Sequence, residues 1–493
     1  MNKSLIRIVT FVGLITLLLF SPVFAVVLAL LFFVANIIHA AMSFVSLNTG
    51  RSIPLGSGVD SKLFVTVLVP TYNEPSHLVI KTLQSLLNQT YTNFEVIVLD
   101  NNTKEKRVWK SVQAFCTKHS KKLRFYHVEG ITGYKSGAIN HALKYIKDKT
   151  DYVLILDSDY ALTPDALKLA LSYIASKDIA LVQFPQSYQN SMQVNEGINL
   201  DFRHFFAVYM NMANSFQCVP STGTVSLMKY SALIDVGGFD TTSITEDAEI
   251  GFRFNMRGYK TIYVDKCIGM GMMPLDIESL QKQRYRWSFG NMQIIRRNMF
   301  KIIFGKALSF KQRLGFMTHL TAWCNFTTIP VLILFCLSIL GIVFPLTSVQ
   351  IFAMQFAAVS VILYLMEKLI LFIVGLRADG FSLKQSLKGF MAHIGLSKVH
   401  MFSWVDCLID DKFCFERTNK FLVDDATRFV KNLFFEIVIG TYLVVLAIMT
   451  RDWLVSIGLL LSGFMLLSAI YTYMQSKQTK LVSLMLKDKL SIK

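Results

Sequence analysis

The chain has 493 residues, of which 53% are hydrophobic and only 17% are charged, and its formal net charge is +17. Because soluble domains carry about 25% charged residues, this composition excludes an ordinary cytosolic enzyme and a disordered chain and indicates a membrane protein. In so apolar a chain, excess Lys and Arg is typical of loops that face anionic headgroups or phosphates, and we expect no nucleic acid partner.

Residues 1–50 predict an N-terminal transmembrane hairpin. The apolar stretch 5–47 is about twice the ~20 residues that cross a bilayer, and Ser21-Pro22 divides it into two spans. A cleaved signal peptide is the alternative, because Lys3 precedes an apolar run and residues 23–25 resemble a cleavage site. The second apolar run follows at once, which favours the hairpin.

Residues 61–275 predict an α/β domain. Short β-branched runs alternate there with helix-like segments, and each run is followed by a polar break. Continuous apolar strands are typical of a mostly parallel sheet that is covered on both faces. The expected strands are 63–70, 94–99, 123–128, 152–156 and 179–183.

Polar residues follow three of these strands, at the edge where open α/β sheets bind their ligands. They are Thr71, Tyr72, Asn73 and Glu74 after the first strand, Asp100 after the second, and Asp157 and Asp159 after the fourth. No G-x-G-x-x-G follows the first strand, and the glycines in residues 130–136 have the wrong spacing for a P-loop, so neither a dinucleotide site nor a P-loop is expected.

The Asp157-Ser158-Asp159 turn predicts a site for a hard divalent cation. Two carboxylates one residue apart offer the oxygen ligands that Mg²⁺ or Mn²⁺ prefers, and a diphosphate would complete the shell. Alone, such a pair is more often a solvated turn. Its significance comes from two further motifs along the chain, Thr245-Glu246-Asp247 and Gln283-Arg284-Tyr285-Arg286-Trp287.

Two polar but amphipathic stretches predict helices that lie in the membrane interface, within segments 276–310 and 377–427. Four more spans are expected within segments 318–376 and 428–475, which with the hairpin gives about six. The expected later spans are 318–344, 351–376, 429–449 and 453–474.

The charge distribution places the α/β domain in the cytoplasm. The short connections near residues 21–22 and 347–350 carry no Lys or Arg, and the third carries only Arg451, whereas Lys3 and the basic tail 476–493 share the other side with the α/β domain. We therefore expect a multi-pass integral protein of a bacterial cell or plasma membrane, with membrane lipid as a partner.

Glu367 and Lys368 fall inside an expected span. An ionisable pair at membrane depth indicates a pathway or functional site by default, and a pair satisfied by neighbouring helices is the equal alternative. The seven cysteines are scattered and contain no C-x-x-C pair, so they predict reduced thiols rather than a disulfide framework or a zinc site.

Taken in order, these motifs resemble the processive family 2 glycosyltransferases, which are the cellulose, curdlan, chitin and hyaluronan synthases. The resemblance is close over residues 65–293 and looser over the spans. Lys135-Ser136-Gly137-Ala138-x-Asn140 matches the family's Lys-Ala-Gly-Ala-Leu-Asn stretch, with Ser136 in place of the first alanine. The motifs that carry it are Asp100, Asp157-x-Asp159, Thr245-Glu246-Asp247 and Gln283-x-x-Arg286-Trp287.

The resemblance implies a GT-A (Rossmann-like) α/β cytoplasmic domain beside the helical transmembrane bundle, and transfer from a UDP-sugar. Asp247 of the Thr245-Glu246-Asp247 motif would be the general base, and Asp159 with Asp157 would hold the metal. The remaining roles concern the nucleotide sugar. Its expected contacts are Pro70, Thr71, Tyr72, Glu74, Asp100, Lys135 and Arg286.

The same resemblance assigns acceptor binding to Gln283 and to Trp287, whose ring would stack on the acceptor sugar. The alternative for Trp287 is an anchor at the membrane surface. Residues 415–420 resemble the gating loop of cellulose synthases, with Thr418 and Lys420 closing over the nucleotide; a basic loop at the headgroups is the alternative.

Two departures from the family pattern refine the prediction. Asp100 is followed by Asn101-Asn102 where the family often has a second aspartate, so uracil recognition falls to Asp100 alone. Thr245-Glu246-Asp247 differs from the Gly-Glu-Asp or Gly-Asp-Asp of chitin and hyaluronan synthases and favours the glucan side.

The predicted function is an inverting, metal-dependent glycosyltransferase that extends a β-linked glycan from UDP-glucose and secretes it through its own channel, with the growing polysaccharide as acceptor. The alternatives are a transferase that glycosylates a lipid, a chitin- or hyaluronan-type synthase that uses UDP-GlcNAc, and a transporter whose cytoplasmic domain senses nucleotide. The sequence leaves the oligomeric state open.

Overall fold

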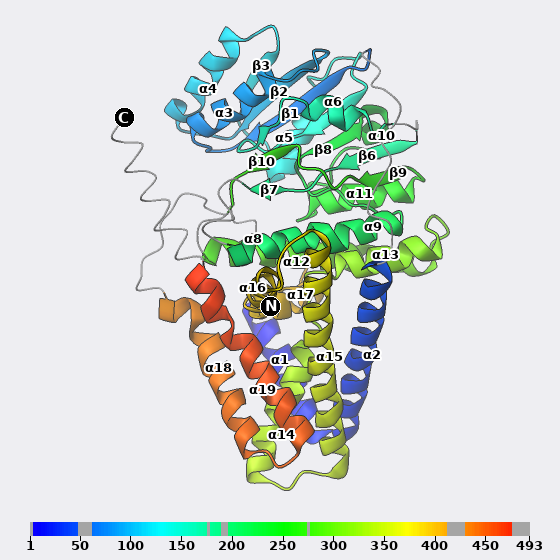
Figure 1. Ribbon diagram of the computed structural model, residues 1–493, viewed down its shortest axis with the longest axis vertical. Coiled ribbons are helices and arrows are strands. Elements are labelled where there is room, and N and C mark those ends of the chain that lie inside the picture. The colour runs from blue at the N-terminus through cyan, green and yellow to red at the C-terminus, as the bar shows by residue number, and fades with distance from the viewer. Residues whose placement is uncertain are drawn as a thin grey trace.

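The computed structural model describes residues 3–47, 62–174, 178–188, 196–273, 277–411 and 429–475. It has three layers, which Figure 1 shows from top to bottom. An α/β domain lies at one end, a set of helices lies across its base, and a bundle of long apolar helices forms the other end.

The α/β domain is built on a seven-stranded sheet of order β3-β2-β1-β4-β8-β6-β9. All neighbours pair in parallel except β8, which is antiparallel to β4 and β6. This confirms the mixed α/β core, and five strands lie at the runs expected from the sequence. The strands are β1 (Val65–Thr71), β2 (Phe94–Asn101), β3 (Leu123–Val128), β4 (Tyr152–Ile155), β6 (Ile179–Gln183), β8 (Ser226–Lys229) and β9 (Lys260–Tyr263).

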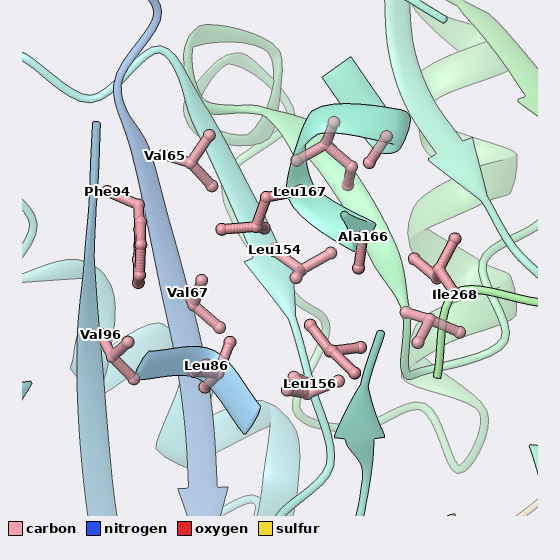
Figure 2. Close-up of a cluster of buried hydrophobic side chains, with 14 of the residues drawn as sticks. Val65, Val67, Leu86, Phe94, Val96, Leu154, Leu156, Ala166, Leu167 and Ile268 are labelled. Atoms are coloured by element: carbon pink, nitrogen blue, oxygen red, sulfur yellow. The ribbon is translucent and has the colours of Figure 1, made fainter. Parts of the chain in front are cut away.

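Both faces of the sheet are buried, as continuous apolar strands require. Val65, Val67 and Leu154 point into one core, which Figure 2 shows beneath the helix that carries Ala166 and Leu167. Leu68 and Ile97 point into the core on the opposite face. The covering helices are α3 (Ser76–Leu87), α4 (Lys106–Lys118), α5 (Tyr134–Leu143), α6 (Ala166–Leu171), α10 (Tyr230–Asp235) and α11 (Glu246–Met256).

A small second sheet, of order β5-β10-β7, closes the base of the α/β domain. A Cβ on Gly271 of β10 would lie 2.1 Å from the ring of Tyr160, so only glycine permits this close approach. The strands are β5 (Ala161–Leu162), β7 (Ser187–Tyr188) and β10 (Gly269–Gly271).

The middle layer consists of helices that lie across the base of the domain (Figure 1). Segment 276–310 holds one continuous helix, α12, and segment 377–427 holds two helices, α16 and α17. Buried apolar residues of these helices pack against both neighbouring layers. The layer comprises α8 (Glu196–His204), η1 (Phe205–Met210), α9 (Asn211–Ser215), α12 (Ile277–Phe304), α13 (Phe310–Leu320), α16 (Leu383–Ile394) and α17 (Ser397–Ile409).

The third layer is apolar. Three helical segments of the described chain have the length and hydropathy needed to cross a bilayer, namely Pro22–Val45, Ser348–Ala378 and Trp453–Gln475, and two further apolar helices are shorter. The helices of this layer are α1 (Lys3–Phe20), α2 (Pro22–Leu47), α14 (Thr328–Val343), α15 (Ser348–Ala378), α18 (Phe429–Met449) and α19 (Trp453–Leu467).

The expected span 318–344 does not form as one helix. Helix α13 ends at Leu320 and α14 begins at Thr328. Between them, the side-chain oxygen of Asn325 accepts hydrogen bonds from both the backbone N–H and the hydroxyl of Thr327, which starts α14 anew. A hydropathy pattern does not reveal such a turn, because the stretch as a whole remains apolar enough to be counted as one span.

Candidate active site

A cavity of about 660 Å³ opens at the carboxyl ends of β1, β2 and β4. It is called the donor pocket below. Its position follows from the parallel strands, whose carboxyl ends leave the connecting loops at one edge of the sheet. Its walls include Pro70, Thr71, Tyr72, Glu74, Asn101, Asn102, Tyr134, Lys135, Asp157, Asp159 and Arg286.

Lys135 joins the turn after β4 to the segment that precedes β8. Its Nζ donates to Asp157 Oδ1 at 2.5 Å and to the carbonyl oxygen of Gly223 at 2.6 Å. The carboxylate of Asp157 is the main favourable charge, and it keeps the pKa of the lysine raised although burial opposes this. Lys135 is therefore a fixed positive charge beside the acidic turn.

The first turn of α5, which carries Lys135, is held against the preceding loop by close backbone contacts. A Cβ on Gly137 would lie 1.8 Å from the carbonyl oxygen of Thr132, so the glycine of this motif allows the loop to fold onto the first turn of α5. Tyr134 has φ +53°, in the left-handed region, and its carbonyl accepts a hydrogen bond from the side chain of Asn101 at 3.2 Å.

Glu246 and Asp247 open helix α11, where the helix N-terminus favours negative charge. Burial and then the Asp247 charge raise the pKa of Glu246 to about 7. Burial also raises the pKa of Asp247, against the positive charge of Lys135 and a hydrogen bond from the backbone N–H of Ala248. A carboxyl group with a raised pKa is suited to accept a proton near neutral pH.

The two acidic motifs approach each other around Lys135 and Gly223. A Cβ on Gly223 would lie 2.7 Å from Asp247 Oδ2 and 3.5 Å from Lys135 Nζ, and the φ of this residue is +84°. The aspartates of β4 and of α11 therefore flank one lysine, although about ninety residues separate them in the sequence.

A second, much smaller cavity of about 40 Å³ is lined by Asp247. It is called the acceptor cavity below. Aromatic rings and small polar groups surround it, and the side chains of Thr222, Thr245 and His319 each bury a polar atom that has no hydrogen-bond partner among the described residues. Its lining is Gln186, Phe205, Phe206, Ser221, Thr222, Thr245, Asp247, Ala248, Trp287, Asn291, His319 and Trp323.

Helix α12 serves both cavities. Arg286 lines the donor pocket and the adjacent Trp287 lines the acceptor cavity. The Oε1 atom of Gln283 is buried and finds no hydrogen-bond partner within the described chain. A Cβ on Gly290 would lie 2.6 Å from the side chain of Thr245, so this glycine brings α12 directly against the acidic motif.

Asp100 is not among the residues that line the donor pocket, and its expected contact with the nucleobase stays a prediction. Its side chain is buried and saturated: Oδ2 pairs with His127 Nδ1 at 2.7 Å, and Oδ1 accepts from the hydroxyls of Thr71 and Thr103. Because Thr103 in turn accepts from the backbone N–H of Asn73, Asp100 fixes the loop after β1 from behind.

Several lining residues were absent from the sequence prediction. Asn101 ends β2, Asn102 follows it, and Tyr134 begins α5 beside a recognised motif; the pair of asparagines is the signal that marks the first two. Phe205, Phe206, His319 and Trp323 come from distant parts of the chain, and no local pattern distinguishes them from core residues. The expected gating residues Thr418 and Lys420 lie outside the described residues.

The carboxylates of the donor pocket fit a hard divalent cation and leave coordination positions open for a diphosphate. Asp157 and Asp159 contribute carboxylate oxygens at the pocket wall, and Asp157 retains 35% side-chain exposure. No cluster of three or more His, Cys, Asp or Glu gathers in the described part of the chain. A nucleotide diphosphate would complete the shell.

Two known families match parts of the chain. Residues 62–290 match the family described as "Glycosyltransferase like family 2", and residues 234–416 match the family described as "Cellulose synthase". The first match contains the whole seven-stranded sheet and both acidic motifs, and the second contains α11 to α17.

Three curated relatives show the extent of similarity. The chain is 32% identical over 177 residues to a UDP-forming cellulose synthase catalytic subunit of Dictyostelium discoideum, covering 35% of this chain and 17% of the relative. It is 26% identical over 288 residues to the corresponding subunit of Komagataeibacter sucrofermentans, covering 56% and 36%. It is 27% identical over 254 residues to the probable glucomannan 4-beta-mannosyltransferase 15 of Arabidopsis thaliana, covering 49% and 47%. The chain therefore matches less than half the length of each.

Among solved structures, the mannosyltransferase PcManGT from Pyrobaculum calidifontis, in complex with GDP-Man and Mn²⁺, has a similar fold. The TM-score is 0.51 at 19% identity, and the match covers 79% of this chain and 98% of the other.

Proposed function

We propose that the chain is a membrane-bound hexosyltransferase that extends a β-linked glycan from a nucleotide sugar, because residues 62–290 match the family 2 glycosyltransferases and residues 234–416 match the cellulose synthase family. One observation carries the proposal: Asp247 lines a narrow aromatic cavity and is flanked by the lysine that also binds the β4 acidic turn of the adjoining donor pocket.

The donor pocket holds the nucleotide sugar. Its volume and its position at the strand ends suit a nucleoside diphosphate, and Lys135 and Arg286 place positive charge where the diphosphate leaves. Asp157 and Asp159 would hold Mg²⁺ or Mn²⁺, which supplies Lewis-acid stabilisation of the departing diphosphate when bound. Tyr72 and Tyr134 line the pocket wall and offer aromatic faces to the nucleobase of the donor.

The transfer is a single displacement. The acceptor hydroxyl attacks the anomeric carbon, the bond from that carbon to the diphosphate oxygen breaks, and Asp247 takes the hydroxyl proton. Attack opposite an α-linked leaving group gives a β linkage. The raised pKa of the buried Glu246 and Asp247 carboxyls supports the role of proton acceptor near neutral pH.

The acceptor cavity selects a flat, hydroxylated chain end. Trp287 and Trp323 supply aromatic faces, and the buried polar atoms of Thr222, Thr245 and His319 supply hydrogen-bonding groups. Helix η1, which lines the cavity, contacts both α15 and α2, and this supports export of the glycan through the membrane layer. We propose that six helices, including the short α14 and α18, form that layer with the α/β domain in the cytoplasm.

UDP-glucose is the first candidate donor, because the cellulose synthase relatives are UDP-forming. GDP-mannose is the second candidate. A glucomannan mannosyltransferase is among the relatives, and neutral amides at Asn101 and Asn102 line the end of β2.

The test is transfer by purified protein in membrane vesicles. UDP-glucose, UDP-GlcNAc and GDP-mannose are each supplied with radiolabel, and both nucleotide release and product length are measured. We expect one donor to give a long glycan, with D247N losing about 10²- to 10⁴-fold in transfer rate while it still binds the nucleotide. Labelled lipid without a long glycan would replace the polymer function by lipid glycosylation, and full transfer by D247N would overturn the base assignment.

A further inference from the structure

The wall of the acceptor cavity contains an uncommon backbone element. Phe205 and Phe206, which line the cavity, begin the π-helix η1. Such wide turns occur mostly as short interruptions and often at functional sites. Phe205 also stacks on Trp323, with ring centroids 4.8 Å apart, so the position of η1 sets the position of two aromatic walls.

One face of the long span α15 holds η1 through three successive contacts. Lys368 Nζ donates to Tyr209 OH at 2.7 Å. One turn later, Phe372 stacks on His204, which precedes η1, with centroids 3.6 Å apart. A Cβ on Gly375 would lie 2.5 Å from the side chain of Val208, so the absent side chain at Gly375 allows the close approach.

The first of these contacts is coupled to a second span. Lys368 Nζ lies 3.5 Å from Glu367 Oε1, and the same oxygen lies 3.0 Å from His39 Nδ1 on α2. Lys368 and Glu367 are 0% and 2% exposed. The pair therefore connects α15, α2 and η1 by polar contacts that water cannot replace.

Apolar packing alone would hold these helices together at lower cost. A buried ion pair is often no more stable than apolar side chains of similar volume, and charges within a membrane span are expensive. What directional polar contacts add is a fixed register between two elements. The element that Lys368 fixes is η1, since its partner Tyr209 lies one turn from Phe205 of the acceptor cavity.

We propose that the Lys368–Glu367 pair is a positioning device for the acceptor: it fixes η1 against the two spans and so sets the width and alignment of the acceptor cavity. This inference rests on the proposed function and names residues that act on glycan length and acceptor binding, not on donor binding or on proton transfer.

The test compares K368M and Y209F with Q355L. Gln355 lies on the same helix and donates to Asp452 Oδ2 at 2.8 Å, and this contact is remote from η1, so it is a matched control for loss of one polar contact in α15. Each variant is assayed in vesicles for glycan length, for the KM of an added oligosaccharide acceptor and for the KM of the donor.

We expect K368M and Y209F to raise the acceptor KM about tenfold, as loss of one hydrogen bond to a charged group would, and to shorten the product. The donor KM and the rate of nucleotide release without acceptor stay unchanged, and K368R restores part of the product length. Q355L behaves as the unmodified protein. Thermal unfolding in detergent shows whether K368M is folded. If K368M is not folded, the comparison of acceptor KM and product length rests on Y209F, which removes only one hydroxyl.

Product length and acceptor KM in Y209F equal to those of Q355L would overturn the inference, as would an equal rise in donor KM. These outcomes leave the proposed function intact. An unmodified protein that releases nucleotide but makes no glycan from any donor overturns the proposed function, and the inference with it.

Discussion

The donor pocket and the acceptor cavity approach each other where Lys135 and Asp247 both lie close to Gly223, but they are constructed in opposite ways. The donor pocket is wide, and its walls come from loops that follow neighbouring strands of one sheet. The acceptor cavity is narrow, and most of its walls come from α11, α12, η1, α13 and the stretch after α13. The donor pocket therefore depends on strand order, and the acceptor cavity depends on how the helices of the middle layer pack against one another and against the apolar layer.

This difference predicts separate consequences for substitutions on the two sides. Loops at strand ends are fixed by local hydrogen bonds, such as those from Thr71 and Thr103 to Asp100, and a change there affects nucleotide binding. Helices of the middle layer are fixed by contacts to the spans, and a change there affects the glycan. Only residues at the junction, such as Lys135 and Asp247, affect both.

The largest effect is expected at the acidic turn of the donor pocket. D159N removes a charged oxygen ligand from the divalent ion, and loss of several kcal/mol of charge stabilisation corresponds to about 10²- to 10³-fold in transfer rate. Nucleotide release measured across a series of Mn²⁺ concentrations checks this, and D159N should need far more Mn²⁺. The exposed Asp165 provides the control D165N, which keeps the Mn²⁺ dependence of the unmodified protein.

The next effect concerns the junction and is visible in the pH profile. The base acts when deprotonated, so transfer rises with pH as Glu246, whose pKa burial raises to about 7, and Asp247 lose their protons. Lys135 lowers the pKa of both carboxyls. K135M removes this charge, so the rise moves to higher pH and the rate at pH 7 falls, whereas K135R keeps the profile. A profile that is unchanged in K135M contradicts the placement of the base beside Lys135.

The donor side is also where sequence reasoning succeeds. Alternating apolar runs locate the five expected strands because parallel strands are buried on both faces, and polar residues at their carboxyl ends mark the pocket. The motif of residues 135–140 is fixed by a backbone approach at Gly137 that any larger side chain would block. Such features depend on residues close together in the sequence, so they can be predicted from it.

Sequence reasoning fails on the acceptor side, because contacts between residues far apart in the chain leave no pattern in the local sequence. Phe205 and Trp323 read as core residues, and only the fold brings them beside Trp287. The break at Asn325 and the π-helix η1 are likewise invisible in a hydropathy pattern. Asp100 shows that sequence reasoning has the same limit on the donor side. Its position at the carboxyl end of a strand can be predicted from the sequence, but its hydrogen-bond partner His127 comes from another strand, β3.

A smaller effect is expected from W287L, and it sharpens the comparison because the neighbouring Arg286 belongs to the donor side. Loss of the ring removes about 1 kcal/mol of aromatic contact, so the acceptor KM rises about fivefold and the product shortens. The donor KM is unchanged. W287F keeps an aromatic face, so its acceptor KM should lie between that of W287L and that of the unmodified protein. Equal changes in donor and acceptor KM would show that α12 does not separate the two cavities.

The smallest effect is expected from H127F, behind the donor pocket. The phenyl ring keeps the stack on Trp109, whose centroid lies 4.2 Å from that of His127, but it cannot donate to Asp100. Asp100 still accepts from Thr71 and Thr103, so the loop after β1 loosens without collapsing, and a loss of about 1 kcal/mol raises the donor KM about fivefold at most. The half-buried His119, at the end of α4, gives the control H119F. Because the support from His127 reaches only the loop after β1, glycan length at saturating donor should equal that of the unmodified protein; a shortened glycan would mean that the two cavities are coupled through the sheet rather than at Asp247 alone.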